Sequence, residues 1–138
     1  MKNLLKLLLP VLMVFATPLV TASDDVSPTS VSGATTIDAT KAKALFDNEA
    51  LFIDTRKDKD WNAGRIPGAE HLDVKKVLTQ ESLAEVAGKD EPIVMYCNGH
   101  KCIRSSKATA MAVEWGYSKI YYFRDGFPAW KAAGYPVE

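Results

Sequence analysis

The chain has 138 residues, the length of one domain, and its 47% hydrophobic and 25% charged residues are ordinary for a soluble globular protein. Its 17 basic and 17 acidic residues give a formal net charge of zero, which argues against electrostatic binding of nucleic acid. The two cysteines and two histidines do not have the spacing of a zinc site. We therefore expect no metal, no organic cofactor and no nucleic-acid partner.

Residues 1–22 have the three parts of a secretory signal peptide. Two lysines give a positive start, residues 7–16 form an apolar centre, and residues 20–22 provide a small-residue cleavage site before Ser23. The apolar centre is short for a transmembrane span. We expect cleavage, a periplasmic or secreted protein, and no stable membrane insertion afterwards. An uncleaved N-terminal anchor is the alternative.

Residues 23–35 are rich in Ser, Thr, Asp and Gly and have no apolar periodicity, so we expect a disordered lead-in. The folded domain is then expected over residues 36–138, enough for one core of modest size. Within it, short apolar segments alternate with helical segments that begin at capping residues and end at glycines. The predicted strands are 36–37, 50–53, 69–72, 93–96 and 119–123, and the predicted helices follow Asp38, cover 57–63, follow Thr79, and cover 105–115 and 128–133.

Strands separated by helices predict a three-layer α/β fold, in which a mostly parallel sheet of five strands has helices on both faces. Ligands of such sheets bind beyond the carboxyl ends of the strands. Asp54 directly follows one predicted strand and Cys97 follows another, so both are expected at this edge.

Cys97 ends a short apolar strand and is followed by a Gly-containing, cationic loop and then a helix. Backbone N–H groups and the positive end of the helix dipole meet at such a junction. This environment lowers the pKa of a thiol, so we predict that Cys97 is a thiolate nucleophile. The alternative is a buried cysteine with a structural role. The residues predicted to bind the substrate are those of the loop, Asn98, Gly99, His100, Lys101, Cys102, Ile103 and Arg104.

Cys102 lies five residues after Cys97 in the same loop. In an oxidising compartment the two could form a disulfide if their Cα atoms come within about 7 Å. One interpretation is a reversible bridge, in which Cys102 acts as a redox partner and resolves an oxidised form of Cys97 such as a sulfenate. The other is that Cys102 only lines the loop. His100 either steers anions, acts as a general acid or is merely solvated.

Asp54 and Arg56 end the second predicted strand beside the same edge. We expect them to form a buried ion pair or hydrogen-bond network that holds the loop. Asp54 would then be structural support, and Arg56 an additional substrate contact. We assign no separate general base, since a thiolate formed by its surroundings requires none.

Three segments of the chain carry family motifs. The first joins residues 52–56 (FIDTR) to 61–69 (WNAGRIPGA), the second is the Tyr-Cys pair at 96–97, and the third is 123–137 (FRDGFPAWKAAGYPV). Together they resemble the rhodanese family of sulfurtransferase-like single domains, although Arg65 stands where a histidine is commoner in that family. The resemblance covers nearly all of the predicted domain.

The resemblance implies that Cys97 accepts a sulfane sulfur as a persulfide from a small sulfur-containing anion such as thiosulfate, and passes it to a thiol or cyanide-like acceptor. The family's usual loop has four residues between the cysteine and a position where an arginine often stands. If Arg104 is that arginine, the loop is longer by two residues, as in phosphatase relatives of this fold. Alternatively, Cys102 occupies the arginine's position.

The same residues are compatible with three other functions. The first is a thiol redox protein that uses the pair Cys97 and Cys102 together with a redox partner protein. The second is a non-catalytic module that binds small anions or a partner in the same loop. The third is a phosphatase, which would need Arg104 to close a cradle around the phosphate.

Overall fold

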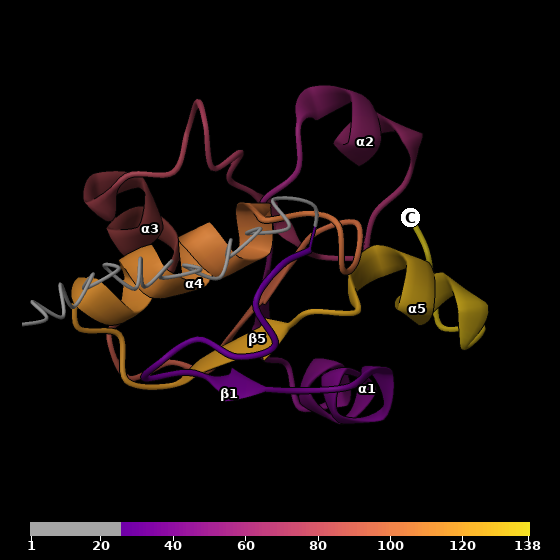
Figure 1. Cartoon of the computed structure of the whole chain (residues 1–138), viewed down its shortest axis with the longest axis horizontal. Helices are drawn as coiled ribbons and strands as arrows, with labels where there is room; N and C mark the ends of the chain where they lie inside the picture. Colours follow the sequence, from indigo (N-terminus) through magenta and orange to yellow (C-terminus); the bar gives the residue numbers. More distant parts are fainter. Residues whose placement is uncertain (1–25) are drawn as a thin grey trace, which may run out of the picture.

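The computed structural model describes residues 26–138, so the predicted signal peptide lies outside the described residues. Strands and helices alternate along the whole of the described part (Figure 1). In order they are β1 (Thr35–Thr36), α1 (Ala39–Asp47), β2 (Leu51–Asp54), α2 (Asp58–Ala63), β3 (Glu70–His71), α3 (Gln80–Val86), β4 (Ile93–Tyr96), α4 (Arg104–Glu114), β5 (Ile120–Phe123) and α5 (Gly126–Ala132).

All five strands run parallel in one sheet with the order β1-β5-β4-β2-β3. The predicted α/β fold with a five-stranded parallel sheet is therefore confirmed. β4 is the central strand, and its last residue, Tyr96, is in register with Asp54 at the end of β2 and Phe123 at the end of β5. Residues that follow these three strands consequently meet at one edge of the sheet.

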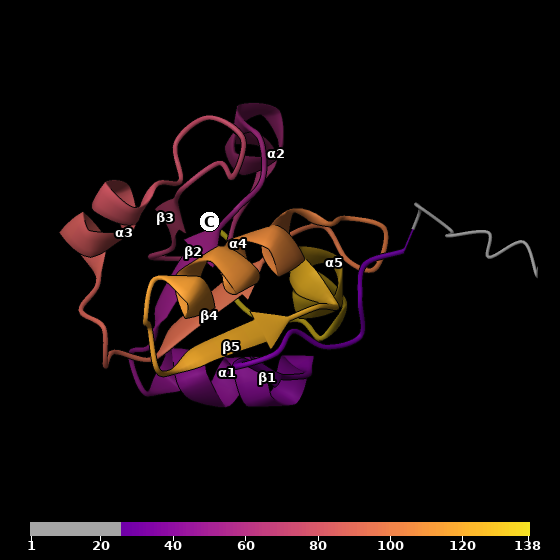
Figure 2. The ribbon, with the colours of Figure 1, turned by 60° about the vertical axis from the view of Figure 1, so that its left-hand side comes forward.

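Helices cover both faces of the sheet, with α3 and α4 on one side and α1 and α5 on the other (Figures 1 and 2). The side chains of β4 alternate between these layers. Ile93 and Met95 pack in the cluster with α3 and α4, and Val94 and Tyr96 pack in the cluster with α1 and α5. All four are fully buried. Burial on both faces explains why this strand is a continuous apolar run in the sequence.

The predicted helix starts at Asp38 and Thr79 are confirmed. The Asp38 carboxylate accepts a hydrogen bond from the backbone N–H of Lys41 at 2.8 Å, and Thr79 forms a capping box with Ser82. The other bounds agree with the predicted ones to within two residues. The last helix begins two residues before Pro128, because a proline is tolerated in a first turn, where N–H groups lack helical partners.

The prediction of a disordered lead-in is wrong for residues 26–35. Ser27 is buried, and its N–H donates to the carbonyl oxygen of His100 at 2.6 Å. The Arg124 guanidinium donates to the carbonyl oxygen of Ser27, and the Tyr122 hydroxyl donates to that of Pro28, both at 2.9 Å. Residues far along the chain thus form the hydrogen bonds of the backbone of this polar segment. We call residues 26–30 the N-terminal strap.

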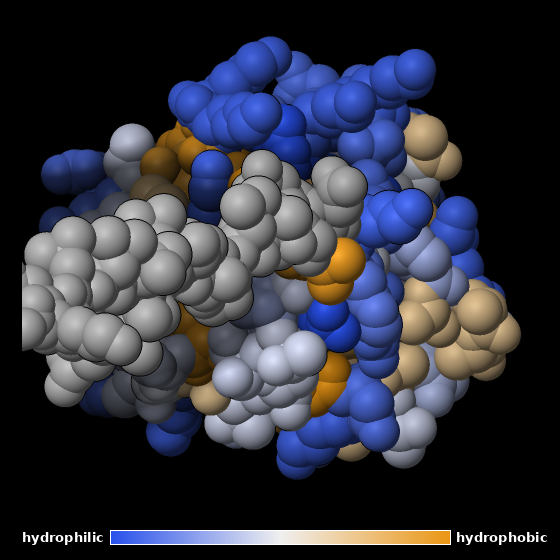
Figure 3. All heavy atoms as spheres, in the orientation of Figure 1, coloured by the Kyte–Doolittle hydropathy of each residue, from blue (hydrophilic) through white to orange (hydrophobic). Residues whose placement is uncertain are grey.

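Figure 3 shows hydrophilic residues over most of the described part of the face in view. None of the helices within residues 26–138 is long and apolar enough to cross a membrane. Ile103 is the only residue of the cysteine loop among the large hydrophobic side chains that are exposed in the described part. These side chains are Val26, Val77, Ile103 and Val137.

Candidate active site

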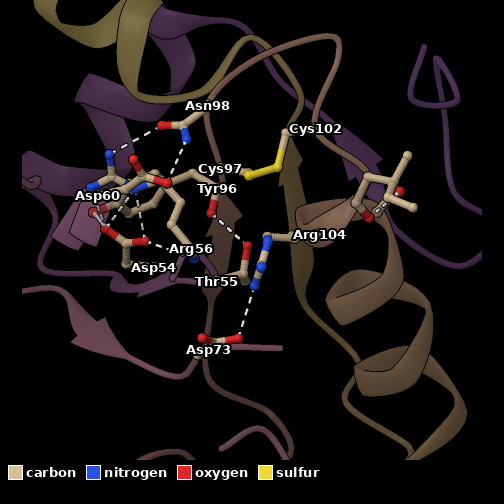
Figure 4. Close-up of a disulfide and its surroundings, with 12 residues drawn as sticks. Asp54, Thr55, Arg56, Asp60, Asp73, Tyr96, Cys97, Asn98, Cys102 and Arg104 are labelled. Atoms are coloured by element: carbon tan, nitrogen blue, oxygen red, sulfur yellow. Dashed lines mark hydrogen bonds and ion pairs between the residues drawn. A yellow bond between two sulfur atoms is a disulfide. The ribbon is translucent and has the colours of Figure 1, made fainter. Parts of the chain in front are cut away.

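Cys97 directly follows the central strand β4 and is 1% exposed. Its sulfur is joined to that of Cys102 in a disulfide, with the two Cα atoms 6.3 Å apart (Figure 4). This distance lies in the range that native disulfides span. The structure therefore brings the two cysteines together without placing Cys102 in the core, since Cys102 is only half-buried.

The start of α5 packs directly against the backbone at Cys97. The N–H of Phe127 donates to the Cys97 carbonyl oxygen at 2.9 Å. Gly126 has a φ of 65°, and a Cβ atom there would stand 2.4 Å from the same oxygen. Only glycine has both the backbone freedom and the small size for this approach. The third motif segment thus positions the cysteine through backbone contacts.

A buried network lies behind the loop (Figure 4). The expected ion pair is present, since Arg56 Nη2 lies 2.7 Å from Asp54 Oδ2 with both side chains almost fully buried. Arg56 also donates to the Asn98 side-chain oxygen at 3.1 Å and to the Gly64 carbonyl oxygen at 2.6 Å. The Tyr96 hydroxyl donates to Asp54 at 2.7 Å. Arg56 therefore contacts the loop from the protein interior and supports it through Asn98.

Two side chains of this network, Tyr96 and Arg56, have raised pKa values. Burial and the neighbouring charge of Asp54 raise the pKa of Tyr96 well above its usual range. Burial alone would lower the pKa of Arg56, but the hydrogen bond and charge of Asp54 outweigh it, so that pKa is raised. The phenol stays a hydrogen-bond donor and the guanidinium stays charged across the physiological range.

The Arg104 side chain is turned away from the disulfide, and its contact with the substrate stays a prediction. It is the first residue of α4, and its Nη1 donates to Asp73 Oδ1 at 2.8 Å. Figure 4 shows the guanidinium directed toward Asp73 and away from the disulfide. Burial would raise the pKa of Asp73, but the hydrogen bonds from the Lys75 N–H and from Arg104 lower it. This placement favours the interpretation in which Cys102 occupies the usual arginine position.

Gly99 is buried, and the other remaining loop residues form the outer side of the site. Asn98, His100 and Lys101 are exposed, and the His100 imidazole pairs with the Asp125 carboxylate. Among residues 26–138, no protein acceptor is found for the backbone N–H groups of 98–101. Unpartnered N–H groups beside cationic side chains can bind an anion. The same part of the chain contains no cluster of three His, Cys, Asp or Glu side chains that could hold a metal ion.

Comparison with known proteins places this site in a family. Residues 38–133 match the family described as Rhodanese-like domain. The chain belongs to the rhodanese family. It is 32% identical over 98 residues to the thiosulfate sulfurtransferase GlpE of Pseudomonas fluorescens (strain SBW25), a match that covers 70% of this chain and 84% of that protein. The resemblance in the three motif segments is thereby confirmed, and the chain is a member of a sulfurtransferase family.

Rhodanese-like domains also occur as parts of larger proteins. The chain is 33% identical over 90 residues to the HTH-type transcriptional regulator Rv0324 of Mycobacterium tuberculosis, a match that covers 65% of this chain but 38% of the regulator. The crystal structure of the Alr3790 protein from Anabaena sp. superimposes with a TM-score of 0.64 at 24% identity, covering 74% of this chain and 90% of that one. This structural match supports the fold.

Four residues of this rhodanese-like site were missed in the sequence. Asp60 accepts a hydrogen bond from the Asn98 amide at 3.1 Å, and Asp73 holds Arg104. Asp73 lies just beyond β3, as Asp54 ends β2, so the rule that ligands gather at strand ends could have found it. Gly126 was visible inside the third motif segment. Ser27 gave no signal, because its polar surroundings resemble those of a linker.

Proposed function

We propose that this rhodanese-like protein is an exported sulfurtransferase that carries a sulfane sulfur as a persulfide on Cys97. The observation that supports it most is the position of Cys97, at the end of the central strand and ahead of α4, in a loop whose backbone N–H groups at 98–101 have no acceptor within residues 26–138. The 11-residue helix α4 directs its positive end toward this loop. The donor would be a small anion such as thiosulfate.

In the first half of the reaction the Cys97 thiolate attacks the outer sulfur of the donor. The new bond joins Cys97 Sγ to this sulfur, and the old bond breaks with its electron pair leaving on sulfite. The loop N–H groups and the positive end of α4 stabilise the negative charge on the donor and on the persulfide that forms. Exposed Lys101 draws the anionic donor to the loop.

In the second half a thiolate or cyanide attacks the outer sulfur of the persulfide and restores the Cys97 thiolate. In the structure Cys97 Sγ is bonded to Cys102, so this form cannot accept sulfur. Reduction of the disulfide must precede the first turnover. The proposed activity is therefore dependent on a reductant.

The disulfide also favours a second candidate, a thiol redox protein that exchanges electrons with a partner through the same pair. The phosphatase alternative is weakened by the contact between Arg104 and Asp73, which removes the guanidinium from the loop. The remaining alternative, a non-catalytic binding module, would not require a nucleophilic cysteine at residue 97, so it predicts no sulfur transfer. The test below separates these functions.

The test is the formation of thiocyanate from thiosulfate and cyanide, on reduced protein in the presence of a thiol reductant that keeps the bond between Cys97 and Cys102 open. We expect activity in the wild type and none in Cys97→Ser. Cys102→Ser is the matched control, because it removes the same disulfide but keeps the nucleophile, and it should still take up sulfur. Wild-type turnover in Cys97→Ser, or none in any protein, would contradict the proposal.

Export rests on the signal-like residues 1–22. We expect the mature protein to begin at Ser23 and to be recovered from the periplasmic or secreted fraction. N-terminal sequencing of that fraction is the measurement. An intact N-terminus beginning at Met1 would replace export and cleavage with membrane tethering.

A further inference from the structure

We infer that Cys102 is the resolving cysteine of this site: it displaces the transferred sulfur from Cys97 as sulfide and leaves the disulfide that the structure contains. The inference rests on the proposed function, because it requires a persulfide on Cys97. It goes further by naming the product, sulfide, and the class of reductant that completes the cycle, a thiol.

The first support is geometric. The Cα atoms of the two cysteines are 6.3 Å apart, and the turn between them is closed by a hydrogen bond of 3.0 Å from the Cys102 N–H to the Gly99 carbonyl oxygen. The folded backbone therefore already brings the two sulfur atoms within bonding distance. When a persulfide forms on Cys97, its inner sulfur lies within reach of Cys102.

The second support is the identity of the group at this position. Arg104 is held by Asp73 at the side of α4, so its guanidinium is not directed at the disulfide (Figure 4). A loop of this kind with an arginine facing the cysteine would hold a persulfide without attacking it. Here the side chain facing Cys97 is a second thiol, which is a nucleophile toward the inner sulfur of a persulfide.

The chemistry balances without an outside oxidant. Loading joins the Cys97 thiolate to the sulfane sulfur of thiosulfate and releases sulfite. The Cys102 thiolate then attacks the inner sulfur, the bond to the outer sulfur breaks, and the outer sulfur leaves as sulfide and takes the thiol proton into solution as hydrosulfide. Two thiol sulfurs are oxidised to a disulfide, and the sulfane sulfur is reduced by the same two electrons.

Burial sets the order of regeneration. Cys97 is 1% exposed and Cys102 is half-buried, so an external thiolate reaches the sulfur of Cys102 first. Attack there forms a mixed disulfide on Cys102 and releases the Cys97 thiolate, which the positive end of α4 stabilises as a leaving group. A second thiol then frees Cys102. The reductant is either a small thiol or a protein dithiol.

The principal experiment adds thiosulfate to reduced protein from which all reductant has been removed. We expect the wild type to release about one sulfide per chain and to lose both thiols, while Cys102→Ser gains one sulfur, releases no sulfide and keeps the sulfur until an acceptor is added. A wild type that accumulates a stable persulfide beside a free Cys102 thiol overturns the inference. Failure of both proteins to take up sulfur overturns the proposed function instead.

A second experiment tests the order of regeneration. Oxidised wild type is mixed with limiting glutathione, quenched with an alkylating reagent and digested with trypsin, which separates the cysteines by cleaving after Lys101. We expect glutathione on Cys102 and the alkyl group on Cys97. The reverse labelling would contradict the order of attack that burial predicts.

Discussion

The two halves of the cysteine loop are held in different ways. Residues 97–99 are fixed from the interior by the N–H of Phe127, by the close approach of Gly126 and by the hydrogen bond from Arg56 to Asn98. Residues 100–103 lie toward solvent. Their hydrogen bonds to other elements include the pairing of His100 with the partly exposed Asp125, the bond from the strap residue Ser27, and the bonds that the Ile103 carbonyl oxygen accepts from the first turn of α4.

This difference assigns different tasks to the two cysteines. The nucleophile belongs to the half whose contacts are buried, so its position is set by the core. The second cysteine belongs to the half with few buried contacts, where local opening requires less free energy. An exposed half suits a sulfur that must meet both a persulfide and an external thiol. The predictions below test the two halves in turn.

The largest effect is expected for Asp54→Ala in the buried half. This substitution leaves the Arg56 charge buried without its counter-charge and removes the acceptor of the Tyr96 hydroxyl. We expect the free energy of unfolding to fall by about 3–5 kcal/mol in urea titrations. The control is Asp47→Ala, which breaks a surface pair with Lys43 and should cost about 0.5 kcal/mol. Equal losses in both variants would contradict the importance of the buried network.

A somewhat smaller loss is expected for Gly126→Ala. The control is Gly134→Ala, because both glycines have a positive φ, 65° and 76°, but a Cβ atom at residue 134 would meet nothing within 4 Å. Both alanines should cost about 1–2 kcal/mol for the left-handed backbone. Gly126→Ala should cost about 1–3 kcal/mol more, because it separates α5 from Cys97. Matching urea midpoints would show that this contact does not position the nucleophile.

Asp73→Asn tests the contact that holds the Arg104 side chain away from residues 100–103, the exposed half of the cysteine loop. The pKa of Asp73 is lowered in the folded protein, so its contribution to stability is present above the unfolded pKa of about 3.9 and is lost as the pH falls through the folded pKa. We expect the variant to be less stable by about 1.5–3 kcal/mol near pH 7. The difference should shrink below about pH 4. A difference that stays constant down to about pH 2 would contradict this assignment.

The smallest effect is expected for Tyr122→Phe, which removes the hydrogen bond to the Pro28 carbonyl oxygen in the strap. The free energy of unfolding should fall by about 0.5–1.5 kcal/mol. Hydrogen exchange at the Ser27 N–H should also become faster, because the strap is held to His100 less firmly. Tyr121→Phe, at the neighbouring position, is the control. If hydrogen exchange at the Ser27 N–H is unchanged in both variants, the bond from Tyr122 to Pro28 does not help to hold the strap against His100, which would contradict this prediction.

The fold could be predicted because its signals are local and agree with one another. The apolar run of β4, the capping residues Asp38 and Thr79, and the three motif segments each indicate the same parallel α/β sheet. The partner of Arg104 could not be predicted in this way. The Arg104 side chain could point into the cysteine loop or away from it, and the position of Asp73 beyond β3 decides between these two directions.

The strap shows the same limit more strongly. A segment rich in Ser and Thr is ordinarily a linker, and nothing near Ser27 in the sequence indicates that Tyr122, Arg124 and His100 satisfy its backbone. Such long-range hydrogen bonds have no periodicity that could reveal them. Whether the two cysteines form a disulfide could not be decided from the sequence for a related reason. Their spacing permits a bridge without requiring one.

The measurement that tests the central claim most directly is the intact mass of two single-cysteine variants after reduction and exposure to thiosulfate. Cys102→Ser keeps only Cys97, and Cys97→Ser keeps only Cys102, so the position of any added sulfur is unambiguous. The account predicts a gain of one sulfur atom, reversible by cyanide, in Cys102→Ser and no gain in Cys97→Ser. A gain in Cys97→Ser alone, or in neither variant, would contradict the persulfide on Cys97.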